Sequence, residues 1–241
     1  MNKVKPVLLD FIRKYHLGGT IESVKWDVKD ETMTTSVISE DKTLVGNISH
    51  SNVPVEDMEV GIYTTSNLVK ILDVFEDRLD LNVNRIDGNK PVNFELKDGN
   101  TNAQFVLASV DVIPAAPKSK HMPDFTARIP IDSNLINRIV KAKNALPDVS
   151  HVTFNSSDDT IEIIIGYSKN NRSNISFKVE SDVTGDINYK SFNSNYLVEI
   201  FKANPNMKEG YIEISNAGLV HVYCTGPDFT CDYYLVEVTH I

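Results

Sequence analysis

The stretch Leu135-Ile-Asn-Arg-Ile-Val-Lys141 has the spacing of an amphipathic helix, with four apolar residues on one face and a lysine after them. Two other stretches, Val7-Leu-Leu-Asp-Phe-Ile-Arg13 and Tyr196-Leu-Val-Glu-Ile-Phe-Lys202, have the same pattern. At about 100° per residue, the final cation lies almost opposite the centre of the apolar face. A helix after Ser66 departs from this pattern, because its cation is Lys70.

The four predicted helices are spaced as two copies of one unit. Position 135 lies 128 residues after position 7, and position 196 lies 128 residues after position 68. The helices are expected at about 5–17, 67–77, 133–146 and 195–204, and the first ends at Gly18-Gly19. The expected N-caps of the other three are Ser66, then Asp132 or Ser133, and Ser194. The proline-containing segment 114–123 is predicted to connect an N-terminal domain, 1–113, to a C-terminal domain, 124–241.

Alternating apolar and polar residues, together with many β-branched residues, predict strands between these helices. Hairpin turns are expected at Asp87-Gly88, Asp98-Gly99 and Asp158-Asp159. The order helix, strands, helix, strands, then the same again, predicts an α+β fold with helices on one face of antiparallel sheets. The strands are expected at 79–83, 92–96, 104–108, 160–165, 174–179, 210–214 and 219–223.

The charge is unevenly distributed. The net charge is −9, which alone argues against a DNA-binding protein. Segments 3–16 and 134–146 carry three net positive charges each, so the remainder carries −15. Packed on one side of a sheet, the helices would therefore form a positive surface on a negative protein.

Motifs for catalysis are missing from the sequence. It has no phosphate-binding glycine loop, no nucleophile elbow and no zinc-protease motif, and its histidines have no metal-ligand spacing. We therefore expect no catalytic residue, no metal and no cofactor. Cys224 and Cys231 are expected to be free thiols, and no apolar run is long enough to cross a membrane.

Four segments in the right order resemble the DNA sliding clamp family. Thr64–Leu72 looks like the second helix of trimeric clamps, and Ile136–Lys141 resembles the third, with two cations three residues apart. Tyr196–Pro205 is similar to the fourth helix, and Asp232–Val236 to the last strand with its Tyr-Tyr-Leu triplet. The length matches the two-domain branch, which includes proliferating cell nuclear antigens and T4-type phage clamps.

The resemblance implies a homotrimeric ring that encircles duplex DNA without reading its sequence and tethers a DNA polymerase. A clamp loader, rather than this chain, would hydrolyse ATP. Subunits would join through edge strands near 104–112 and 174–181. The residues implied to face DNA are Arg13, Lys14, Lys70, Arg138, Lys141, Lys143 and Lys202.

The resemblance also implies a pocket for partner peptides, formed by Leu44, Val45, Ile113, Leu235 and Val236. Ordinary core packing is the alternative interpretation of these apolar residues. The protein is expected to act inside the cell at the site of DNA replication, in the host cytoplasm if its source is a phage. Two other functions stay open: a duplicated β-rich viral structural or assembly protein, and an enzyme with an unrecognised carboxylate site.

Overall fold

The computed structural model describes residues 4–76, 78–87, 89–117, 122–168 and 173–238. The chain divides into two compact units. Unit 1 comprises Met1–Glu40, Gly46–Pro117 and Asp228–Cys231, and unit 2 comprises Asp41–Val45, Lys118–Pro227 and Asp232–Ile241. Each unit therefore contains a short segment from the distant half of the sequence.

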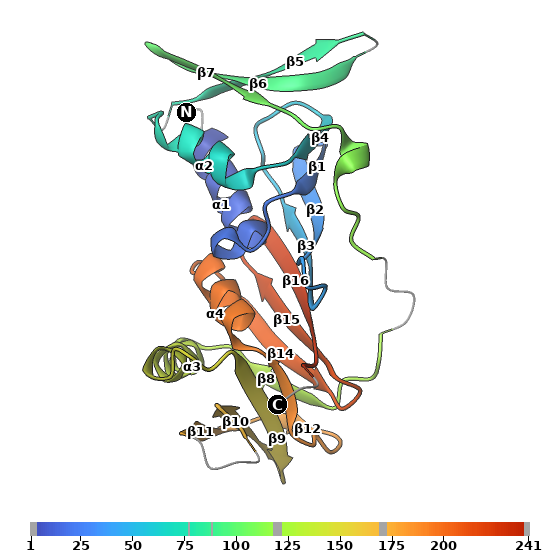
Figure 1. Cartoon of the computed structure of the whole chain (residues 1–241), viewed down its shortest axis with the longest axis vertical. Helices are drawn as coiled ribbons and strands as arrows, with labels where there is room; N and C mark the ends of the chain where they lie inside the picture. Colours follow the sequence, from blue (N-terminus) through green and yellow to red (C-terminus); the bar gives the residue numbers. More distant parts are fainter. Residues whose placement is uncertain (1–3, 77, 88, 118–121, 169–172, 239–241) are drawn as a thin grey trace. The chain divides into compact units, whose positions relative to one another are not determined.

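The described residues of unit 1 form two α-helices and two runs of antiparallel strands (Figure 1). One run has the strand order β4-β1-β2-β3 and the other β5-β6-β7. The elements are α1 (Val4–His16), η1 (Leu17–Gly19), β1 (Val24–Lys29), β2 (Thr32–Ile38), β3 (Leu44–His50), β4 (Met58–Ile62), α2 (Thr65–Asp73), β5 (Asp80–Ile86), β6 (Lys90–Asp98), β7 (Thr101–Val106) and η2 (Val110–Val112).

The described residues of unit 2 also form two α-helices and two runs of antiparallel strands. The strand orders of these runs are β12-β8-β14-β15-β16 and β11-β10-β9-β13. The elements are β8 (Ala127–Pro130), α3 (Ser133–Ala145), β9 (His151–Ser157), β10 (Thr160–Ile165), β11 (Ile175–Glu180), β12 (Asp182–Val183), β13 (Lys190–Asn193), α4 (Ser194–Ala203), β14 (Glu209–Ser215), β15 (Leu219–Thr225) and β16 (Phe229–Val236).

The duplication predicted from the helix spacing is visible in the strand order. The strand order β3-β2-β1-β4 in unit 1 corresponds to β11-β10-β9-β13 in unit 2, and both runs of strands lie between the two helices of the repeat in sequence. The triplet that follows the second helix, β5-β6-β7, corresponds to β14-β15-β16. The predicted α+β class with antiparallel sheets is therefore confirmed.

Alternating burial along the strands builds the core of each unit. In β1 every second residue is buried, including Trp26, whose ring lies 5.9 Å from Phe11 of α1 and 5.9 Å from Phe94 of β6. In unit 2, Phe154 and Phe192 pack with ring centroids 6.0 Å apart. Cys224 and Cys231 keep their thiols rather than forming a disulfide, as predicted, and both are buried.

The helix boundaries differ from the predictions mainly at the caps. Asp132 caps α3 as expected, accepting a hydrogen bond of 2.6 Å from the Leu135 N–H. Asn193, rather than Ser194, caps α4 by accepting from the Asn195 N–H. Ser66 was expected to cap the second helix, but it lies inside α2, which ends four residues earlier than predicted, at Asp73.

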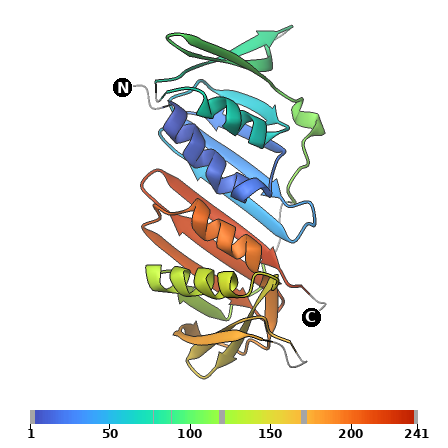
Figure 2. The ribbon, with the colours of Figure 1, turned by 60° about the vertical axis from the view of Figure 1, so that its left-hand side comes forward.

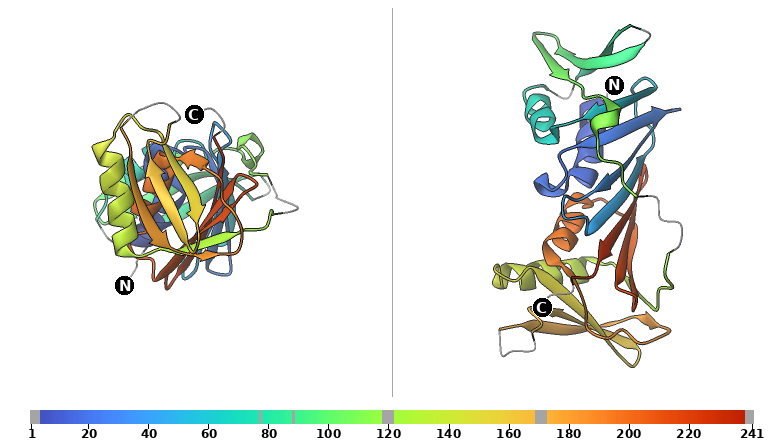
Figure 3. Two further views of the ribbon diagram at one scale, coloured as in Figure 1. Left: turned by 90° about the horizontal axis from the view of Figure 1, so that it is seen from below. Right: turned by 45° about the vertical axis from the view of Figure 1, so that its right-hand side comes forward.

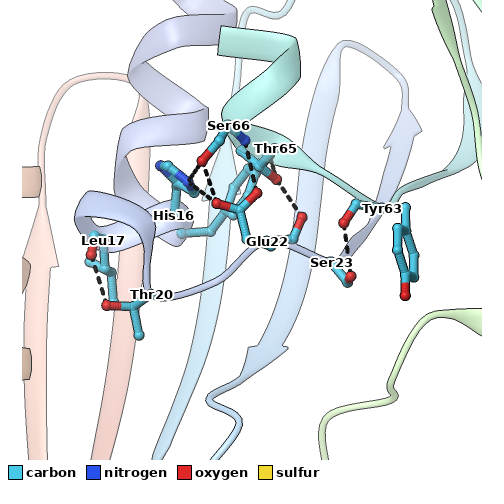
Figure 4. Close-up of polar contacts among 9 residues, drawn as sticks. His16, Leu17, Thr20, Glu22, Ser23, Tyr63, Thr65 and Ser66 are labelled. Atoms are coloured by element: carbon cyan, nitrogen blue, oxygen red, sulfur yellow. Dashed lines mark hydrogen bonds and ion pairs between the residues drawn. The ribbon is translucent and has the colours of Figure 1, made fainter. Parts of the chain in front are cut away.

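The N-cap residue of α2 makes no side-chain hydrogen bond, and the carboxylate of Glu22 caps this helix instead (Figure 4). Glu22, in the segment after η1, accepts from the Ser66 N–H at 2.9 Å and from the Ser66 hydroxyl. His16, the last residue of α1, lies 3.1 Å from the same carboxylate. The Thr65 hydroxyl also donates to the Glu22 carbonyl at 2.8 Å. These contacts tie the end of α1 to the start of α2.

We predict that Glu22→Gln lowers the free energy of unfolding by about 1 kcal/mol at neutral pH, because a helix cap loses its charge. Burial alone would raise the pKa of Glu22, but hydrogen bonds from Ser66 and His16 outweigh it and lower that pKa. The stabilisation is therefore complete above the unfolded-state pKa and disappears as the pH falls through the folded-state pKa. Urea unfolding measures this, with exposed Glu40→Gln as the control; equal losses in both variants would contradict the capping role.

Candidate nucleic-acid interface

The helices of each unit pack beside one another on a sheet, so each presents an outward face (Figure 2). In unit 1, α1 buries Leu8, Phe11 and Ile12, and α2 buries Leu68 and Leu72. The side chains opposite these residues must point away from the core. The outward faces are where the sequence predicts cations that would contact DNA.

Unit 1 presents one exposed cation from each helix. Arg13 of α1 and Lys70 of α2 are both exposed. Lys5, closer to the start of α1, is half-buried, and its ammonium group donates to the carbonyl of Phe75. Arg13 and Lys70 are therefore the helix cations of unit 1 that are most available to phosphate groups.

The prediction that Lys14 faces DNA is wrong. Its side chain is fully buried, with the ammonium nitrogen 3.0 Å from Asp10 Oδ2 and 3.7 Å from the centre of the Phe229 ring. His50 of β3 lies 3.3 Å from the same carboxylate. Burial alone would raise the pKa of Asp10, but hydrogen bonds from His50 and Lys14 outweigh it and lower that pKa. Lys14 thus belongs to a buried charge cluster.

In unit 2, Lys141 of α3 and Lys202 of α4 are exposed. Lys202 has 58% of its side chain exposed and pairs with Glu199 of the same helix at 2.8 Å. Such an exposed pair contributes little to stability and exchanges readily with a phosphate. Lys143 is half-buried and donates to the Pro147 carbonyl at 2.8 Å, so its charge is committed to the end of α3.

Arg138 of α3 is half-buried and differs from the other helix cations. Its guanidinium carbon lies 4.0 Å from the centre of the Phe177 ring of β11. Figure 3 (left) shows α3 alongside the strands that include β11. This stacking makes Arg138 a poorer candidate for phosphate contact than Lys141, which lies one helical turn further along.

The residues predicted to form the partner-peptide pocket are mostly core residues. Leu44 is 0% exposed, Leu235 1% and Ile113 8%, so none presents a side chain to a peptide in this structure. Val45 is half-buried and Val236 is 44% exposed. The core interpretation therefore holds for Leu44, Leu235 and Ile113. Any apolar anchor for a partner at the predicted positions would lie at Val236 and Val45.

The trio Ser66, His16 and Glu22 has the composition of a catalytic triad but not its geometry. The Ser66 hydroxyl donates to the Glu22 carboxylate, whereas a nucleophile would donate to the imidazole. Ser66 Oγ and Glu22 Oε1 also approach the same ring nitrogen, Nε2 of His16. The arrangement is a helix cap, and it gives no support to the enzyme alternative.

One charged cluster was not found from the sequence. His221 of β15 lies between Glu213 of β14, 3.0 Å from Nδ1, and Asp232 of β16, 2.8 Å from Nε2. Its ring stacks on Tyr234 with centroids 4.7 Å apart. Both ring nitrogens can donate to these carboxylates only when the imidazole is protonated. Alternation along three adjacent strands could have indicated a shared face, but not the pairing between strands.

Comparisons with known proteins find a similarity in structure but not in sequence. Scanning the sequence against protein-family models yields no match, and neither does a search of curated proteins. Solved structures match over nearly the whole chain. Proliferating cellular nuclear antigen from Entamoeba histolytica matches with a TM-score of 0.69 and 14% identity, over 98% of this chain and 95% of the other.

Two archaeal structures match similarly. A. fulgidus PCNA, solved with the C-terminal region of FEN-1, gives a TM-score of 0.73 at 14% identity, over 97% of this chain and 96% of the other. The PCNA2–PCNA3 complex from Sulfolobus tokodaii gives 0.71 at 14% identity, over 97% of both chains. The chain has the sliding-clamp fold. The fold resemblance predicted from four short segments is therefore confirmed across both repeats. Among the residues that the structure describes, no helix is long and apolar enough to cross a membrane.

We predict that Lys14→Met lowers the free energy of unfolding by about 2 to 4 kcal/mol, because it removes the cation beside a largely buried carboxylate. Arg13→Met, at the neighbouring exposed position, should change it by less than about 0.5 kcal/mol. Urea unfolding of both variants measures the difference. A Lys14→Met protein of normal stability with weakened DNA binding would restore Lys14 to the DNA-facing set.

We also predict that His221 stabilises the protein in a pH-dependent way. Burial alone would lower the pKa of His221, but hydrogen bonds to Asp232 and Glu213 outweigh it and raise that pKa. The stabilisation is complete below about pH 6.5, the unfolded-state pKa, and disappears as the pH rises through the raised folded-state pKa. Burial also raises the pKa values of Tyr211 and Tyr234, so these neighbours stay neutral in that range.

The measurement is the stability difference between the wild type and His221→Gln, by urea unfolding at about pH 6 and about pH 9. We expect the difference to shrink by about 1 kcal/mol at the higher pH. The control is His151→Gln, because His151 contacts the Tyr167 carbonyl at 2.8 Å rather than two carboxylates. A difference independent of pH would show that His221 contributes by packing alone.

Proposed function

We propose that this protein is a sliding clamp, which encircles duplex DNA as a homotrimer and tethers a DNA polymerase and other replication proteins. The observation that carries the proposal is one exposed cation on each helix of the clamp fold, in a chain of net charge −9. Those residues are Arg13, Lys70, Lys141 and Lys202. The role is binding rather than catalysis, and a separate clamp loader would open the ring.

The physical chemistry of these cations suits sliding. Lysine and arginine attract phosphate groups without reading bases, and each contact on an exposed flexible side chain exchanges easily. A closed ring needs no high affinity, because topology retains it on DNA. The acidic remainder of the chain disfavours DNA on its other surfaces. The site of action would be the cell interior, and the host cytoplasm for a phage protein.

Terminal strands β7 and β11 support assembly into a ring. Each ends its own sheet, with one neighbour among the described strands, and each overlaps a segment expected to join subunits. Val106, the last residue of β7, is 77% exposed. A terminal strand can add a strand from another molecule. Because β7 and β11 are non-equivalent, their pairing would be head-to-tail, which is the type of contact that closes rings.

Assembly is tested by light scattering with size-exclusion chromatography across a dilution series. We expect a species of about three times the 27.0 kDa chain mass that dissociates on dilution. A mass that stays at one chain at high concentration would exclude the ring and favour the structural-protein alternative.

Retention on DNA is tested by assembling the protein from dilute subunits in the presence of nicked circular DNA. A ring should stay on the circle at high salt and leave it after the circle is linearised, because topology and not affinity holds it. Equal loss from circular and linear DNA would contradict encirclement.

We predict that Lys141→Gln weakens DNA binding and lowers the slope of log affinity against log salt by at least about 1, because a phosphate contact is lost. Lys29→Gln is the matched control, since Lys29 is also exposed but lies on strand β1. Titration of fluorescent duplex DNA at several salt concentrations measures both slopes. Equal effects in the two variants would show that net charge, and not the helix surface, governs binding.

A further inference from the structure

The stacking of Arg138 on Phe177 points to a role other than DNA contact. Arg138 shares α3 with Lys141, and a cation at each position fits the DNA-facing pattern equally well in sequence. In the structure their surroundings differ: Lys141 is exposed, whereas Arg138 is half-buried with its guanidinium 4.0 Å from a ring centre. The partner that the structure gives Arg138 is therefore the aromatic ring of Phe177.

Helix geometry explains the difference between these cations. The buried residues of α3 are Leu135, Ile139 and Ala142. At 100° per residue, Arg138 lies about 70° from the centre of this buried face and Lys141 about 130°. Arg138 therefore lies at the flank of the helix, where a long side chain reaches across to the neighbouring sheet.

Phe177 lies in the middle of β11, the terminal strand of the sheet β11-β10-β9-β13. Its neighbour on β10 is Ile163, and its side chain is only 9% exposed although the strand ends the sheet. Arg138 supplies cover on the helix side of that ring. If Arg138 turned toward a phosphate, it would lose the stacking and expose the aromatic face, so the two roles compete.

We infer that Arg138 braces β11 as the strand that pairs with β7 of a second copy, and that it supports ring closure rather than contacting DNA. This inference rests on the proposed ring. It assigns different functions to two cations that lie three residues apart on one helix. Lys141 acts on DNA, while Arg138 acts on the joint between subunits.

The test compares Arg138→Gln with Lys141→Gln, which removes the same charge from the same helix. The first measurement is amide hydrogen exchange of 175–180, and the second is the concentration at which the trimer half-dissociates. Arg138→Gln should speed exchange by about threefold to tenfold and raise the half-dissociation concentration by a similar factor. Lys141→Gln should change neither but should weaken DNA binding.

Phe177→Leu provides the second arm, because it removes the ring and keeps an apolar side chain. In that background Arg138→Gln should have no further effect on exchange or dissociation, since the stacking partner is gone. Unchanged exchange and dissociation in Arg138→Gln, with DNA binding lost as in Lys141→Gln, would overturn the inference. A wild-type chain that never assembles would instead overturn the proposed function, so the two failures are distinguishable.

Discussion

Burial of the apolar stripe of each helix is the constraint on which the candidate interface depends. Once Leu8, Phe11 and Ile12 pack into the core of unit 1, the rotation of α1 is fixed. Arg13 must then face solvent, while Lys14, about 100° further round, enters the interior and requires Asp10 as a partner. One hydrophobic requirement therefore separates cations that are available to a ligand from cations that hold the fold together.

Much of this architecture could be predicted from the sequence, because the spacing of apolar residues and the residues that end a helix or strand depend only on neighbours in the chain. The strand 160–165 is predicted at its observed bounds, and the turn at Asp98-Gly99 joins two expected strands. The turn at Asp158-Asp159 joins the expected strand 160–165 to β9, which the sequence does not predict, and Gly88 of the third turn lies outside the described residues. The equal spacing of 128 residues between corresponding helices agrees with the strand order, which is the same in the two repeats. These features need only neighbours in sequence, and a repeat doubles the evidence for each of them.

The contacts that could not be predicted join residues far apart in sequence. Glu22 caps α2 across 44 residues, and His221 is held by carboxylates from two neighbouring strands. Leu44 and Leu235 look the same in sequence whether they line a pocket or fill a core, and their packing decides that they fill a core. The sequence predicts the same DNA-facing role for Arg138 and Lys141, because residue spacing shows which side of a helix a side chain occupies but not that Phe177 lies beside Arg138.

The same structure suggests why a sliding ring would divide its cations between two tasks. Phosphate contacts must exchange as DNA passes, which favours exposed side chains such as Lys70 and Lys141 that no fixed partner holds in a deep site. A joint between subunits must persist through that exchange, which favours a cation held against an aromatic side chain, as Arg138 is held against Phe177. If one residue performed both tasks, each phosphate contact would loosen the joint. Separating them on one helix would let DNA move without opening the proposed ring.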